Sequence, residues 1–220
     1  MFGTFTRGGQ PVTGQEFTLS MRDSNISFDW TEYKAATDEN GRFAFDRVPF
    51  GGIQIGRLVT MAPKSWTHSY GADVTVLPGQ TTQVTLGDSG ATLTGRIRFE
   101  SPPAEGEKLS LRGSLYNVLP PPPGGLSGEE ARAYYQTPEG KAITRQAKTF
   151  VVNISDDGSW NVDSIPPGTY RITVRASKPG ASSLENPPVA TGTAQVVVPQ
   201  AATPQTQISM DEVVLRPNSK

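Results

Sequence analysis

Short runs of alternating apolar and polar residues recur along the whole chain, and turn-forming residues separate them. The clearest run is 170–174, where Tyr, Ile and Val alternate with Arg and Thr. An apolar residue at every second position is the period of a half-buried strand. Turn signals at roughly 8–12-residue intervals between such strands are typical of an all-β sandwich or barrel. The pattern therefore predicts an all-β protein.

One stretch of the chain occurs twice. Residues 38–55 and 155–172 align without a gap, and both carry a turn, an alternating strand, a proline and a glycine in the same order. The turn is Asn-Gly in the first copy and Asp-Gly in the second, which predicts tight hairpins because these residues tolerate a positive φ. The alternation at Phe43 and Phe45, and at the matching Trp160, predicts a strand with one buried face.

The break between the two copies falls at the polar, turn-forming cluster of residues 87–90. A chain of 220 residues is long enough for two domains of about 100 residues each. We therefore predict one β-sandwich over 1–88 and a second over 89–220. The second contains an insertion, 113–149, that has no counterpart in the first.

The insertion has its own local signals. A run of four prolines at its start predicts a stiff polyproline segment. Ser127 fits the N-cap of a helix over 128–136, and Glu130, three residues later, would complete a capping box. Pro138 would end that helix and start another short turn. This is the only credible helical region of the sequence.

The repeated segment resembles the carboxypeptidase regulatory-like domains, also called transthyretin-like or peptidase-associated domains. The similarity rests on TDENGRFAFDRVPFGG and SDDGSWNVDSIPPGTYRI, and it covers most of 1–88 and, apart from the insertion, 91–215. It implies two tandem antiparallel sandwiches of Ig-like or transthyretin-like form, which are grouped with carbohydrate-binding-like folds. It also implies a non-enzymatic, extracytoplasmic module, periplasmic or on the cell surface. The chain begins directly in a predicted strand, so we expect a fragment of a larger bacterial protein.

Composition narrows the classes of partner. The formal charge is −1 and no basic stripe is visible, so we expect no nucleic-acid partner. The absence of cysteine excludes disulfides, thiolate metal sites and cysteine nucleophiles. No apolar run approaches the roughly 18 residues of a membrane span. We therefore expect no membrane insertion.

Candidate chemistry is sparse. The one histidine, His68, has no Gly-x-Ser-x-Gly motif beside it, so we expect a surface or loop histidine and no catalytic residue. Zinc would need more His or Cys ligands than the chain has. The acidic turns at 38–41 and 156–158 lack the spacing of a calcium loop. We expect no metal site and no cofactor.

Aromatic residues in predicted loops are the remaining candidates for a binding site. Exposed rings suit sugar stacking or protein contact, and the alternative is that each ring covers its own loop. We predict a non-catalytic binding or spacer module that contacts a protein partner or a neighbouring domain. Carbohydrate binding is the alternative. The candidate residues are Trp30, Trp66, Tyr70, Tyr116, Tyr134 and Tyr135.

Overall fold

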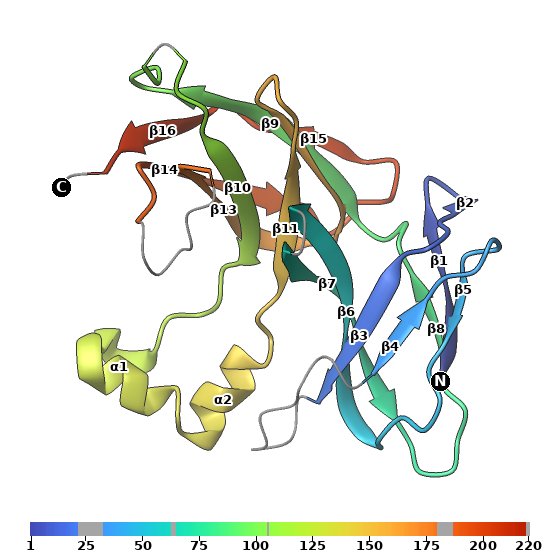
Figure 1. The fold of residues 1–220 in the computed structure, drawn as a ribbon. Helices are drawn as coiled ribbons and strands as arrows, with labels where there is room; N and C mark the ends of the chain where they lie inside the picture. The colour runs from blue at the N-terminus through green and yellow to red at the C-terminus, as the bar shows by residue number, and fades with distance from the viewer. Residues whose placement is uncertain (22–32, 63–64, 105, 180–186, 219–220) are drawn as a thin grey trace.

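The computed structural model describes residues 1–21, 33–62, 65–104, 106–179 and 187–218 (Figure 1). These residues form strands joined by turns, with two short α-helices and a single 3-10 turn. The all-β class predicted from the alternating pattern is confirmed.

The N-terminal half contains strands β1 to β8 in two four-stranded sheets. One sheet has the order β2-β1-β5, with β8 also paired to β1, and the other has the order β4-β3-β6-β7. Their buried side chains share one hydrophobic cluster, which includes Phe5, Phe17 and Phe43. The strands are β1 (Phe2–Arg7), β2 (Gln10–Pro11), β3 (Glu16–Met21), β4 (Lys34–Ala36), β5 (Arg42–Ala44), β6 (Gly51–Ala62), β7 (Ser65–Val76) and β8 (Gln83–Leu86).

The C-terminal half contains strands β9 to β16 in one sheet, ordered β12-β11-β10-β13-β14-β16-β9-β15. A further pairing of β12 with β9 closes seven of these strands into a ring. A second hydrophobic cluster, with Trp160 and Tyr170 among its largest members, fills this half. The strands are β9 (Ala91–Phe99), β10 (Ser110–Asn117), β11 (Thr149–Ile154), β12 (Ser159–Ile165), β13 (Gly168–Ser177), β14 (Ala190–Val198), β15 (Gln207–Ser209) and β16 (Val213–Pro217).

The closed ring corrects the prediction of two tandem Ig-like sandwiches. Strand β9 pairs with β12 along one edge and with β15 and then β16 along the other, so no gap separates two sheets. Alternation cannot distinguish a sandwich from a barrel, because both architectures bury one face of every strand. The division into domains 1–88 and 89–220 stays a prediction.

The repeat seen in the sequence recurs in the geometry. Gly41 and Gly158 have φ angles of 69° and 77°, as the predicted tight turns require. Each turn glycine accepts an equivalent hydrogen bond at 2.8 Å, from the backbone N–H of Phe5 in the first copy and of Ile97 in the second. The two halves therefore share a common strand plan.

The insertion is shorter than predicted. Residues 113–117 belong to β10 and residue 149 to β11, so the excursion is 118–148, here called the arm. It carries η1 (Pro123–Gly125), α1 (Gly128–Tyr134) and α2 (Pro138–Thr144). The predicted capping box is wrong, because the side chain of Ser127 makes no capping hydrogen bond. Instead Thr137 caps α2, and its Oγ1 accepts a hydrogen bond from the N–H of Gly140 at 3.1 Å.

Candidate functional site

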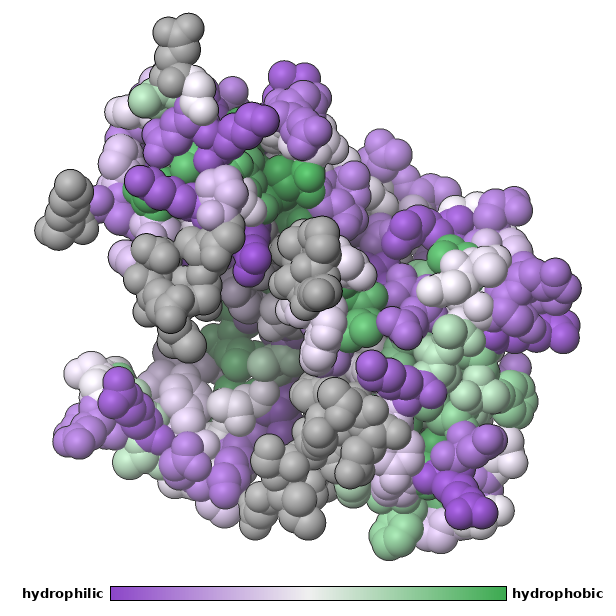
Figure 2. Space-filling view, viewed as in Figure 1, coloured by the Kyte–Doolittle hydropathy of each residue, from purple (hydrophilic) through white to green (hydrophobic). Residues whose placement is uncertain are grey.

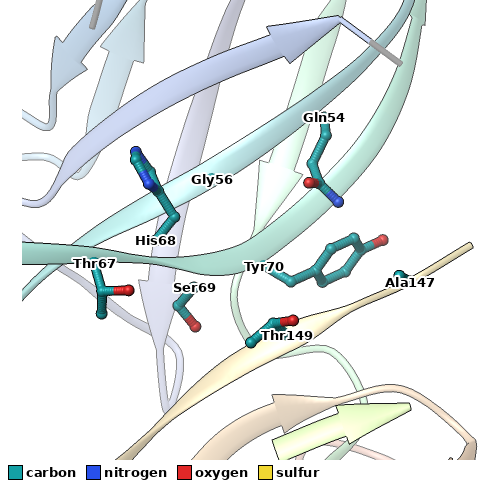
Figure 3. A pocket seen from close by; sticks show the side chains of 8 residues that line it. All are labelled: Gln54, Gly56, Thr67, His68, Ser69, Tyr70, Ala147 and Thr149. Carbon is teal, nitrogen blue, oxygen red and sulfur yellow. The ribbon is translucent and has the colours of Figure 1, made fainter. Parts of the chain in front are cut away.

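A cleft of about 340 Å³ opens where the two halves meet, between the β6–β7 hairpin and the chain that leads from α2 into β11 (Figure 3). We call it the junction cleft. Its walls come from both halves, and most of its side chains carry a hydroxyl, amide or imidazole group. The lining residues are Gln54, Gly56, Thr67, His68, Ser69, Tyr70, Ala147 and Thr149.

Strand β7 forms one wall of the cleft, and Trp66 lies next to that wall. Trp66 and His68 are two positions apart, which places their side chains on one face of the strand. The ring centroids of Trp66 and His68 are 5.3 Å apart. Trp66 is 48% exposed, while His68 and Tyr70 are half-buried. Trp66 therefore offers an accessible indole beside the polar residues of the cleft.

A β-bulge directs Tyr70 towards the C-terminal half. The register of β6 and β7 shifts at Gly71, where a Cβ atom would lie 2.9 Å from the carbonyl oxygen of Ile55. Bulges of this kind turn a side chain out of its regular direction. The ring centroids of Tyr70 and Phe150 are 5.4 Å apart, and the Lys148 ammonium lies 5.0 Å from the Tyr70 ring centroid.

His68 and Ser69 do not form a catalytic pair. They are neighbours in a strand, and Figure 3 shows the imidazole and the hydroxyl on opposite sides of β7. The Ser69 Oγ is fully buried and accepts a hydrogen bond from the N–H of Val151 at 3.2 Å. Burial lowers the pKa of His68, and the charge of Lys34 lowers it further. Of the expected surface or loop position, the loop is wrong, because His68 lies within β7, where it is half-buried.

The arm lies beside the cleft and is tied at its base. The Asn117 side chain donates to the carbonyl oxygen of Gln146 at 2.9 Å and accepts from the N–H of Lys148 at 2.6 Å. Beyond these bonds the arm projects from the ring (Figure 1). Figure 2 shows the surface hollowed between the arm and the ring, with hydrophobic side chains on the floor of the hollow.

The structure places the predicted aromatic residues in different parts of the fold. Trp66 and Tyr70 both lie in β7, so their assignment to loops is wrong. Tyr134 and Tyr135 lie at the end of α1, half-buried, with ring centroids 5.5 Å apart. Tyr116, 38% exposed, lies in β10. Trp30 lies outside the described residues.

Sequence reasoning missed part of the cleft. Gln54 and Thr149 are distant in sequence and meet only through the contact of the two halves. The spacing of Trp66, His68 and Tyr70 was a usable signal, since alternate aromatic residues indicate one face of a strand. His68 interrupts the hydrophobic pattern and so hides strand β7 in the sequence.

Metal-binding clusters and membrane-spanning helices are both missing from the part of the chain that the structure describes. No group of three or more His, Asp or Glu residues there could hold a metal ion. None of the helices described has the length and apolar content that a membrane span needs.

Comparisons with known proteins establish no family. No family model matches the chain, and no curated protein matches it. A minor pilin of Streptococcus agalactiae is 10% identical, with 100% of this chain and 97% of the pilin aligned, at a TM-score of 0.33. A Pseudomonas aeruginosa protein proposed to bind carbohydrate is 16% identical, with 57% of this chain and 90% of that protein aligned, at a TM-score of 0.29. A streptococcal ancillary pilin is 15% identical, with 100% of this chain and 62% of the pilin aligned, at a TM-score of 0.27. TM-scores of this size carry no argument, so the resemblance to carboxypeptidase regulatory-like domains stays a prediction.

Proposed function

We propose that the protein is a non-catalytic, extracytoplasmic binding module that holds a protein partner, or a neighbouring domain of a longer chain, against its arm. The single observation that carries this proposal is the arm itself. It projects from the ring, is tied at its base by Asn117, and carries two half-exposed tyrosines. An element of this kind has no evident role in supporting the core.

The side chains of the arm support a binding role. Neither hydrophobic cluster of the described residues includes any residue of 118–148. Tyr134 and Tyr135 supply large contact area at a low cost in conformational entropy, which is why tyrosine is enriched where proteins bind one another. A partner that covered both rings would remove apolar surface from water and gain free energy of binding.

Deletion of the arm tests the proposal. The N–H of Asn117 donates to the carbonyl oxygen of Lys148 at 3.2 Å, so the two ends of the arm already pair as strands do. Replacement of 118–147 by Asn-Gly should close a two-residue hairpin and leave the ring intact. In a pull-down from cell-envelope extract of the source organism, we expect the deletion to lose a partner that the full chain recovers.

A double variant, Tyr134→Ala with Tyr135→Ala, serves as the matched control for the deletion. It keeps the length of the arm and removes only the two rings, so we expect the same partner to be lost or strongly reduced. Undiminished recovery by both variants would remove the arm from the function.

Carbohydrate binding is the second candidate, and one observation favours it. Trp66 is 48% exposed beside a cleft lined by hydroxyl, amide and imidazole groups. An accessible indole next to hydrogen-bonding groups suits a sugar ring, which presents an apolar face and a polar edge. A glycan array followed by fluorescence titration tests this reading, with Trp66→Phe as the control. If no polysaccharide changes the Trp66 signal, the candidate fails.

A further inference from the structure

Asp163 joins the two halves through a pair of arginines. It belongs to β12 of the C-terminal half, while Arg57 and Arg7 belong to β6 and β1 of the N-terminal half. The Asp163 carboxylate lies 2.6 Å from the Arg7 Nε and 3.4 Å from an Arg57 guanidinium nitrogen. We call this contact region, together with the neighbouring bond between Ser69 and Val151, the seam.

The Asp163 carboxylate is the counter-charge of the Arg57 guanidinium. The Arg57 side chain is only 10% exposed, and burial lowers its pKa while the Asp163 carboxylate raises it. A buried guanidinium without a counter-charge is costly, since it has lost its hydration and gained nothing in return. Loss of the carboxylate therefore favours an opening of the seam that lets more water reach the Arg57 guanidinium.

The joint between the halves is short and is held at both ends. The Asp88 carboxylate accepts hydrogen bonds from the N–H groups of Gly8 and Gly9, which ties the joint to the β1–β2 turn. On the other side Gly90 packs so closely that a Cβ atom would lie 2.0 Å from the carbonyl oxygen of Ile165. Any rotation of one half against the other would centre on this joint, and the contacts of the seam oppose such a rotation.

We propose that Asp163 is a positioning residue that keeps the seam closed and thereby sets the width of the junction cleft. Gln54 and Tyr70 on one wall move with the N-terminal half, and Thr149 on the other moves with the C-terminal half. Any rotation of the halves therefore changes the distance between the walls. This control of the angle between the halves does not rest on the proposed function.

The repeat supplies a matched control. Asp46 occupies the position in residues 38–55 that Asp163 occupies in residues 155–172. It is exposed and belongs to the N-terminal half. Asp46→Asn therefore makes the same chemical change at the equivalent place in the fold, away from the seam.

Distance measurement between spin labels tests the proposal. The chain has no cysteine, so Thr85→Cys in β8 and Arg175→Cys in β13 would carry the only two labels, both at exposed strand positions. We expect double electron–electron resonance to show one narrow distance distribution in the labelled parent and in Asp46→Asn. In Asp163→Asn we expect a broader distribution with an added population at another distance.

A second substitution tests whether the unpaired charge of Arg57 causes the broader distance distribution. Arg57→Met in the Asp163→Asn background removes the buried cation that needs water, so we expect the narrow distribution to return. An unchanged distribution in Asp163→Asn would overturn the proposal, and so would a double variant as broad as the single one. Complete unfolding of Asp163→Asn, reported by the fluorescence of buried Trp160, would also overturn it, because the carboxylate would then support the fold and not the angle.

Discussion

Gly95 lies directly opposite Trp160 in the β9–β12 ladder, and the indole packs onto its backbone. A Cβ atom at Gly95 would lie 2.7 Å from Cζ2 and 2.9 Å from Nε1 of Trp160. Both distances are well below van der Waals contact, so Gly95→Ala must push the largest side chain of the second core out of place. The perturbation is therefore one methyl group added to a closely packed core.

The expected cost follows from two opposing effects. Overpacking a well-packed core costs about 1–3 kcal/mol. Removing a glycine from a strand returns roughly 0.5–1 kcal/mol through the entropy of the unfolded chain. We expect a net loss of about 1–2 kcal/mol in the free energy of unfolding. For a chain of this size that loss lowers Tm by about 2–8 °C.

Rescue by a smaller ring is the decisive assay. The three nearest atoms to the added Cβ all belong to the Trp160 side chain, and the Trp160 Nε1 is buried without a hydrogen-bond partner. Trp160→Phe deletes those indole atoms, so Gly95→Ala should cost much less in that background. Urea unfolding of both single variants and the double variant gives the coupling energy, which we expect to be about 1–2 kcal/mol. Additive costs would refute the reasoning.

The equivalent glycine of the first copy is a contrasting control. A Cβ atom at Gly3 would lie 2.5 Å from the carbonyl oxygen of Val84 and 2.6 Å from Cζ of Phe43. A backbone oxygen cannot rotate away as a side chain can. We therefore expect Gly3→Ala to be destabilising whether or not Phe43 is made smaller, and rescue by Phe43→Leu would contradict this.

Three further predictions follow from single contacts. Burial raises the pKa of Tyr170 to about 12 in the folded protein. The side chain of an unfolded tyrosine ionises near pH 10. The stabilisation is therefore fully present below about pH 10, and the free energy of unfolding falls by about 2–3 kcal/mol as the pH rises to about 12. Urea unfolding across that range should show a slope that Tyr170→Phe lacks, and equal slopes would disprove the assignment. Thr137→Ala should speed amide exchange in α2 without changing global unfolding, whereas Ser127→Ala should leave α1 as it was, because only Thr137 makes a capping bond. Gly41→Ala should cost more than Gly158→Ala in thermal unfolding, by about 1 kcal/mol, because its Cβ would lie 2.6 Å from a carbonyl oxygen against 3.1 Å at Gly158; the reverse order would contradict this.

Much of the local structure could be predicted because its causes are local. The turn at Gly41 needs only a residue that tolerates positive φ, and the strand after it needs only apolar side chains at alternate positions. The predicted capping box at Ser127 is wrong, because a capping hydrogen bond depends on the direction of one side chain, which sequence spacing does not determine. In contrast, the Thr137 side chain accepts a capping hydrogen bond from the N–H of Gly140 at the start of α2.

The candidate site was only partly predictable. Trp66 and Tyr70 could be named as aromatic candidates from the sequence, but the strand that holds them contains His68 and a bulge at Gly71, which hide its alternation. Thr149 carried no signal at all, because its place in the cleft depends on how the second half rests against β7. Contacts of this kind join residues about 80 positions apart, as the bond between Ser69 and Val151 does.

The sequence by itself determined that the chain is built from strands, that the plan is repeated, and where its tight turns lie. Those properties follow from the φ preferences of single residues and from a period of two, and both act over a few neighbouring positions. Only the tertiary structure decided that the second sheet closes on itself, that Arg57 meets Asp163, and that a cleft opens at the junction. These depend on which strand edges and buried charges meet across the fold, and that outcome is set by the packing of the whole chain.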